Sequence, residues 1–126
     1  MIDHSSELTI WITAKSIYLE IFKMFDSYKD YFFRSQILRA TLSISNNIAE
    51  GFGRRSKREF IQFLMISKGS CNEVESMLLI AKDLGEFKNY DIDKLITNLR
   101  NNHNSIGALV HSLQAQLDST QKKKQN

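Results

Sequence analysis

Glutamate and histidine are the residue types in this sequence whose spacing could build a metal site. A carboxylate-bridged two-metal bundle takes a Glu-x-x-His motif from each of two helices and further glutamates from the other two. No such motif begins at any of the four central glutamates, which are Glu50, Glu59, Glu73 and Glu75. His103 and His111 are eight residues apart and have no acidic neighbour at ligand spacing. We therefore expect no bound metal and no cofactor.

Nucleophilic chemistry has no better support in the sequence. The serines have no paired histidine, and there is no glycine-rich loop of the Walker type that would hold a phosphate. Cys71 is the only cysteine, and on an apolar helix face a lone cysteine is most often a small core residue. We expect no catalytic residues and predict that the protein is not an enzyme.

Positive charge is concentrated in one central segment. Residues 34–58 contain six Lys or Arg against one Glu, a net charge of +5, while the whole chain has a net charge of +3. The densest part is Arg54, Arg55, Lys57 and Arg58, and three further lysines lie near the end of the chain. This asymmetry favours an anionic partner, and the alternative is a solvated helix end with no ligand. We predict that these four residues bind nucleic acid.

A second group of polar residues lies where a helical core would be apolar. Ser43, Asn47 and Glu50 have the spacing i, i+4, i+7, which places them on one face of a helix. Ser67, Ser70 and Glu73 form a counterpart on the next helical segment. An isolated buried carboxylate is too costly, so each glutamate would need hydrogen bonds from the amide and hydroxyl groups. We predict a buried polar seam, structural in role, where the two helices meet.

The elements that must position these side chains are helices. Apolar residues recur every three or four positions, and the chain contains no proline. The pattern predicts helices over about residues 7–25 and 30–51, a third from Ser56 to Gly85, and a fourth from Asn89 or Asp91 to about residue 118. Ser56 starts a capping box, because a glutamate follows it three residues later. Four long helices with short connections predict an all-α, antiparallel up-down bundle.

The glycines refine this arrangement. Gly51 and Gly53 are expected to end the second helix because glycine tolerates positive φ, and Gly85 is expected to cap the third in the same way. Gly69 lies inside the third helix, where it costs about 1 kcal/mol relative to alanine. We expect the compensation to be a close approach by another helix at this point.

Chain length, apolar stretches and cysteine count predict the domain organisation and the cellular compartment. Residues 1–118 are predicted to form a single domain, and residues 119–126 are predicted to be a disordered basic tail without an apolar anchor. No apolar stretch reaches the roughly 18 residues that a membrane span needs, and the first residues lack a signal-peptide pattern. A single cysteine suits a reducing compartment. We expect a cytoplasmic protein without membrane contact.

The apolar stripes of two helices are wider than one bundle requires. The first helix shows Ile10, Ile17, Ile21 and Met24 beside its main stripe, and the third shows Ile61, Met65, Ile66, Leu79 and Ile80. A soluble monomer rarely exposes large contiguous apolar patches, because another subunit usually covers them. We therefore predict a homo-oligomer.

The central segment also resembles a known family. The run LRATLSISNNIAEGFGRRSKREFIQFLMISKGSCNEVESMLLIAKDLG, residues 38–85, resembles the four-helix-bundle family known from intervening sequences of 23S ribosomal RNA genes. Its hallmark string is matched by Ser43, Ile44, Ser45, Asn47, Ile48, Ala49, Glu50, Gly51, Gly53 and Arg54. A later element is matched by Phe63, Leu64, Gly69, Ser70 and Glu73. A proline that is usual before the core asparagine is replaced here by Asn46.

The resemblance implies a fold and an assembly rather than a reaction. Members of this family are similar to the accessory variability determinant protein of diversity-generating retroelements, a pentameric barrel that joins a reverse transcriptase and nucleic acid. The resemblance therefore implies a ring-like homopentamer that contacts RNA or DNA, with no established catalytic residues. Two functions remain open. The first is an oligomeric nucleic-acid-binding accessory factor, and the alternative is a protein-interaction scaffold that docks a partner enzyme such as a reverse transcriptase.

Overall fold

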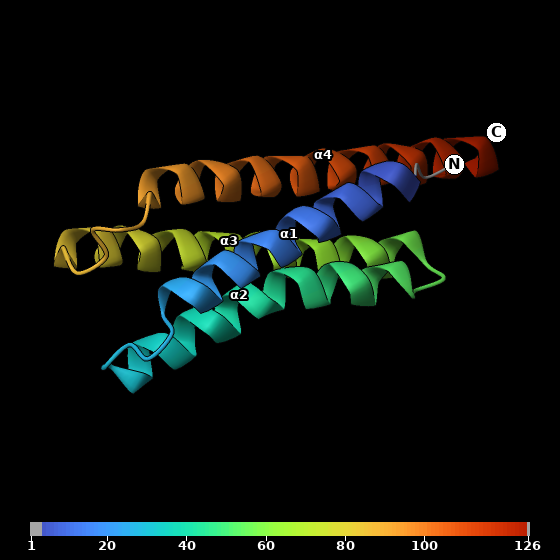
Figure 1. The fold of residues 1–126 in the computed structure, drawn as a ribbon. Helices are drawn as coiled ribbons and strands as arrows, with labels where there is room; N and C mark the ends of the chain where they lie inside the picture. Colours follow the sequence, from blue (N-terminus) through green and yellow to red (C-terminus); the bar gives the residue numbers. More distant parts are fainter. Residues whose placement is uncertain (1–3, 126) are drawn as a thin grey trace.

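The computed structural model describes residues 4–125, and the side chains of residues 7–123 within them. Over that range the chain forms four helices and no strand (Figure 1): α1 (His4–Met24), α2 (Tyr31–Phe52), α3 (Lys57–Leu84) and α4 (Ile92–Gln125). Successive helices run in opposite directions. Each helix packs against its neighbours in the order α1, α2, α3, α4 and back to α1, so α1 and α3 lie diagonally opposite. The predicted all-α four-helix bundle is confirmed.

Side-chain caps define the starts of three helices. Asp30, Ser56 and Asp91 each accept a hydrogen bond from the backbone N–H three residues later, at distances of 3.1, 3.3 and 3.0 Å. Such caps satisfy donors that the first turn of a helix leaves without partners. Gly85 ends α3 in the left-handed conformation, with φ of 69°. The predicted boundaries of the third helix are confirmed, and Asp91 rather than Asn89 caps the fourth.

The glycines at the end of α2 act differently from the prediction. Gly53 caps the helix with φ of −77°, and neither Gly51 nor Gly53 has positive φ. The expected conformational reason is therefore wrong. A Cβ atom on Gly51 would lie 2.5 Å from Cδ1 of Phe60, a separation that real Cβ atoms essentially never show. Gly51 is needed because the Phe60 ring of α3 lies directly against the α2 backbone.

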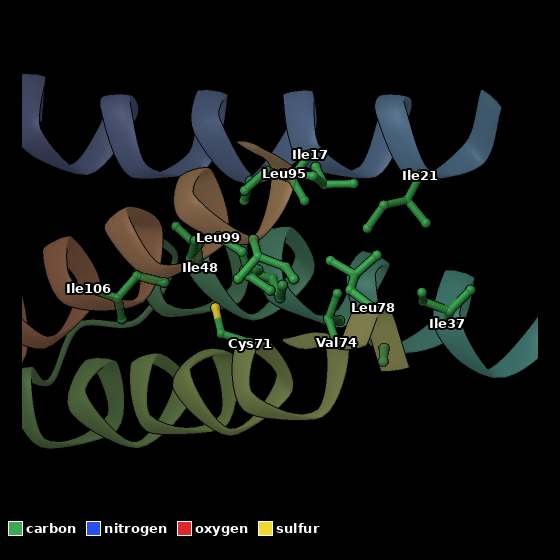
Figure 2. Close-up of a cluster of buried hydrophobic side chains, with 14 of the residues drawn as sticks. Ile17, Ile21, Ile37, Ile48, Cys71, Val74, Leu78, Leu95, Leu99 and Ile106 are labelled. Atoms are coloured by element: carbon green, nitrogen blue, oxygen red, sulfur yellow. The ribbon is translucent and has the colours of Figure 1, made fainter. Parts of the chain in front are cut away.

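The core lies between the four helices along their whole overlap (Figure 2). Each helix contributes aliphatic side chains that are almost completely buried, and full burial of one such side chain stabilises the fold by about 1.5–3 kcal/mol. The labelled members are Ile17 and Ile21 of α1, Ile37 and Ile48 of α2, Cys71, Val74 and Leu78 of α3, and Leu95, Leu99 and Ile106 of α4. Cys71 is thus a core residue, and its burial raises the pKa of the thiol to about 12.

Four aromatic side chains close one end of the bundle. Phe25, Tyr28, Phe33 and Phe87 come from the α1–α2 connection, the start of α2 and the α3–α4 connection. The ring centroids of Phe25 lie 5.3, 5.7 and 4.7 Å from those of the other three. We call this group the aromatic end. It joins the two connections that lie on the left of Figure 1.

The last turns of α4 differ from the expected disordered tail over residues 119–126. The structure continues α4 as one helix through Gln125, with the side chains of residues 119–123 exposed. No glycine or proline interrupts the segment, and glutamine and lysine are good helix formers. Residue 126 lies outside the described residues. Lys122 and Lys123 therefore extend from a helix. None of the four described helices is long and apolar enough to cross a membrane.

Candidate nucleic-acid interface

The predicted basic residues lie at the end of the bundle opposite the aromatic end. Arg54 and Arg55 are in the α2–α3 turn, and Lys57 and Arg58 begin α3. Figure 1 places this turn at the same end as the last turns of α4, which carry further lysines. We call Arg54, Arg55, Lys57, Arg58, Lys122 and Lys123 the basic end. The fold therefore brings together two cationic segments that are far apart in the sequence.

Arg54 is the member of this group that the protein holds in place. Its Nη2 atom donates a hydrogen bond to Oε2 of Glu50, 3.1 Å away and one helical turn earlier. Its guanidinium also lies 4.8 Å from the ring centroid of Phe63 on α3. The side chain of Arg54 is 43 % exposed and that of Glu50 is 59 % exposed. Water screens such a pair, so it orients the guanidinium more than it stabilises the fold.

Arg55, Lys57 and Arg58 have no such partners among the described residues. Arg55 and Arg58 are exposed, and within the described part of the chain neither forms an ion pair or a side-chain hydrogen bond. Lys57 is half-buried and lines a hollow whose other walls come from α4. The α4 residues are Ser112, Ala115, Gln116, Ser119 and Thr120. This hollow connects the turn to the last part of α4.

The polar seam between α2 and α3 exists in a reduced form. Ser70 Oγ of α3 donates to Ser43 Oγ of α2 at 2.9 Å, and Asn47 Nδ2 donates to the same oxygen at 2.9 Å and to the Ser43 carbonyl at 2.8 Å. One turn away, Ser67 Oγ donates to the carbonyl of Ile44 at 2.7 Å. Ser43, Asn47 and Ser70 are therefore brought together, and Ser67 adds a second link between the helices.

The two glutamates assigned to the seam are not part of it. Glu50 and Glu73 are both exposed, and Glu50 pairs with Arg54 instead. This part of the prediction is wrong because the hydroxyl and amide groups satisfy one another, so each carboxylate remains in water at lower cost. No helix of the described chain makes the close approach expected at Gly69. Its position is exposed, and a Cβ atom there would meet nothing within 4 Å, so α2 does not approach it closely.

Several buried polar residues were not predicted from the sequence, among them Asn102 and Glu7. Asn102 is 2 % exposed, and its Nδ2 donates to the carbonyl of Ile10 at 3.1 Å, which links α4 to α1. Its position between Leu99 and Ile106 on the apolar stripe was a signal that could have found it. Glu7, in the first turns of α1, is also 2 % exposed. Nothing in its spacing separated Glu7 from an ordinary first-turn carboxylate.

Within residues 4–125, no three His, Cys, Asp or Glu side chains gather closely enough to hold a metal ion. The thiol of Cys71 is buried, and its raised pKa keeps it protonated at neutral pH. His111 is exposed, and a ring nitrogen of His103 lies 3.5 Å from the side-chain oxygen of Asn104. Of the basic end, Arg54, Arg55, Arg58, Lys122 and Lys123 are exposed and Lys57 is half-buried.

The fold and these side chains define a small antiparallel four-helix-bundle protein with a cationic end. The family model of the 23S rRNA-intervening sequence protein matches residues 6–108, and the chain belongs to this family. It is also similar to the crystal structure of a protein of unknown function from the S23 ribosomal protein family of Bacteroides thetaiotaomicron. The TM-score is 0.76, with 18% identity over 84% of this chain and 98% of that chain, which shows a shared fold. A comparison with curated proteins finds no match.

Proposed function

We propose that this protein is a non-catalytic accessory factor that binds the phosphate backbone of RNA or DNA through its basic end. The observation that carries the proposal is the convergence of residues 54–58 and the last turns of α4 at one end of the bundle. Arg55 and Arg58 are exposed there, with no ion pair inside the described chain to neutralise them. Exposed cations without acidic partners are the groups that displace counterions from a phosphate backbone.

Binding of this kind has a characteristic dependence on salt. The logarithm of the binding constant falls with the logarithm of salt concentration by a slope of about 0.9 for each duplex phosphate neutralised. It carries little sequence preference, because phosphate contacts position a protein without reading bases. Phe52 is 37 % exposed, and its ring centroid lies 5.7 Å from that of Phe60. We assign Phe52 to packing at the end of α2 rather than to base stacking.

The family supports a nucleic-acid partner and suggests the first probe. It is described by its connection to an intervening sequence of 23S rRNA, so a fragment of 23S rRNA is the natural RNA to test. The family resemblance also implies a ring-like homopentamer, in which the basic end would be repeated once per subunit. Repetition would raise the number of phosphates contacted and steepen the salt dependence.

A pair of charge reversals tests the proposal. The variant Arg55→Glu with Arg58→Glu changes two exposed side chains, and we expect it to retain its helical content while losing most of its affinity for RNA and DNA. The matched control is Lys88→Glu with Lys94→Glu, which makes the same change in net charge near the α3–α4 turn. Both control lysines are exposed. The readout is a gel shift titrated with salt.

The outcomes separate a local site from an effect of net charge. Binding that is lost in the first variant and retained in the control supports the basic end. Equal binding by the first variant and the wild-type protein would contradict the proposal. Equal losses in both variants would also contradict it, because any reduction of net charge would then suffice.

A protein-interaction scaffold is the second candidate, and one observation favours it. Tyr31 and Phe32 begin α2 with 76 % and 73 % of their surfaces exposed. Exposed aromatic residues are enriched where proteins dock on one another. Such a scaffold would hold a partner enzyme, for example a reverse transcriptase. Capture from lysate, with and without nuclease treatment, distinguishes the two: a protein partner that survives nuclease and is lost in Tyr31→Ser with Phe32→Ser supports the scaffold.

A further inference from the structure

The side of α3 that faces away from the core exposes four large apolar side chains among polar ones. Met65, Ile66, Leu79 and Ile80 are 48 %, 50 %, 43 % and 48 % exposed. Their spacing places them on the helix face opposite the buried stripe that includes Leu64, Cys71 and Leu78. We call this surface the α3 outer face. Exposed polar residues, among them Asn72, Glu73 and Ser76, separate the two apolar pairs. Large exposed apolar side chains grouped on one face mark a contact site for another protein.

Gly69 lies on the same face, between the two apolar pairs. It is exposed, and a Cβ atom there would meet nothing within 4 Å. A glycine in the interior of a helix is less stable than an alanine, because it loses more conformational freedom on folding. No contact inside the described chain repays that cost. A glycine flanked by large apolar side chains does let the backbone of a second helix come close, since the distance between packed helices depends on the side chains at the contact.

A second apolar surface lies on α1. Leu8, Ile12, Leu19 and Phe22 are 54 %, 46 %, 49 % and 43 % exposed. They follow one line along α1, and the buried residues of this helix, such as Ile17 and Ile21, lie on the other side. We call this surface the α1 outer face. Because α1 and α3 are diagonal partners in the bundle, the two outer faces cannot cover one another within one chain.

The two outer faces carry opposite charges near their centres. Lys15 lies in the middle of the α1 outer face, with its Nζ atom 5.2 Å from the ring centroid of Trp11. Glu73 lies in the middle of the α3 outer face, one turn from Gly69. Neither charge forms an ion pair with another residue of the described chain. Opposite charges at matching positions favour contact between unlike faces, whereas contact between two copies of one face would bring like charges together.

We propose that the α1 outer face of one copy of this chain packs on the α3 outer face of another, with the helices crossing near Gly69 and Lys15 opposite Glu73. The contact is heterologous, so each copy uses one face to receive a neighbour and the other to join the next. Heterologous contacts build closed rings or open chains rather than two-fold dimers. This assignment stands apart from the nucleic-acid proposal and specifies how the predicted homo-oligomer would assemble.

Complementation between two single-face variants tests the assignment. Leu19→Glu places a charge on the α1 outer face, and Ile66→Glu places one on the α3 outer face. Both positions are about half exposed, so the monomer fold should tolerate the changes, which circular dichroism would verify. In sedimentation velocity we expect each variant alone to be a monomer at concentrations where the wild-type chain assembles. The equimolar mixture should form a one-to-one dimer, because each pair still has one intact face of each kind.

The control and the contradicting outcomes follow from the same geometry. Ala108→Glu introduces the same charge at an exposed position of α4 and should assemble like the wild-type chain. If either single-face variant forms dimers by itself, the contact is isologous and the proposal is wrong. A wild-type chain that stays monomeric, or a mixture that stays monomeric, also overturns it.

Gly69 supplies an independent readout. In the monomeric Leu19→Glu background, Gly69→Ala should raise the thermal midpoint by a few degrees, because alanine favours the helix and meets no neighbour. In the otherwise wild-type chain, the same substitution should weaken self-association severalfold, and Gly69→Leu should abolish it. Association that is unchanged in Gly69→Leu would remove Gly69 from the contact.

Discussion

The two ends of the bundle are built from different kinds of side chain. At the aromatic end, Phe25, Tyr28, Phe33 and Phe87 pack against one another, and Phe25 is completely buried. At the basic end, the α2–α3 turn leaves Arg55 and Arg58 exposed, and the last turns of α4 add two lysines. The aromatic end thus holds the α1–α2 and α3–α4 connections together by contacts within the chain.

The difference predicts that stability and the proposed nucleic-acid binding are separated along the long axis. Removing a side chain at the aromatic end should cost folding free energy and leave the cations unchanged. Reversing charges at the basic end should cost affinity and leave the core unchanged. Variants at each end test whether the two properties are independent.

Phe25→Ala should have the largest effect on stability. Its ring is buried and contacts three other rings, so we expect the free energy of unfolding to fall by about 3–5 kcal/mol. Chemical denaturation monitored by circular dichroism measures the loss. RNA binding under folding conditions should stay close to that of the wild-type protein. A loss of affinity in a fully folded sample would show that the two ends are coupled.

Gly51→Ala should have an intermediate effect at the basic end. The added methyl group would meet the Phe60 ring at 2.5 Å, so either the ring or α2 must shift. We expect a loss of about 1–3 kcal/mol, as for other overpacked contacts. Gly53→Ala is the matched control, because the nearest atom to its Cβ is 3.6 Å away and its φ is negative. Equal stability of the two variants would contradict the steric role of Gly51.

Substitution of Tyr28 should have the smallest effect on stability, and this effect should depend on pH. Burial, followed by the Glu86 carboxylate and its hydrogen bond, raises the pKa of Tyr28 above its ordinary value of 10.0. The unfolded chain therefore loses this proton first, and the contribution of Tyr28 to stability declines as pH rises above about 10. Tyr28→Phe should show a shallower decline of stability between pH 9 and about 11. Thermal midpoints of both proteins measured across that pH range test this prediction. If the midpoint falls equally with pH in Tyr28→Phe and in the wild-type protein, Tyr28 is not the cause of the decline.

Much of the fold could be predicted from sequence because its signals are local. The capping box at Ser56, the left-handed Gly85 and the apolar repeat each depend on residues within a few positions of one another. The structure of the end of α4 could not be predicted in this way. Its residues lack an apolar anchor, which predicted disorder, yet their helix propensity and the absence of a breaker allow α4 to continue through Gln125.

The candidate site was less predictable because it depends on distances across the bundle. Helical spacing put Glu50 and Glu73 on the face with Ser43 and Ser70, but spacing does not show whether a carboxylate lies inside or just outside a seam. Gly51 needed the position of the Phe60 ring, which no local rule supplies. The convergence of the last lysines with the α2–α3 turn likewise required the length of α4. Whether the basic residues bind nucleic acid stays a prediction.

The links between Ser43 and Ser70, and between Ser67 and the Ile44 carbonyl, fix how α2 and α3 lie along one another. A slide of one helix by a single turn, about 5.4 Å, would break both and leave hydroxyl groups without partners in the interior. These two links therefore fix the position of the α2–α3 turn relative to both helices. An incoming polyanion would meet cations on an already rigid support, so the entropy lost on binding would come from a few arginine and lysine side chains rather than from the backbone.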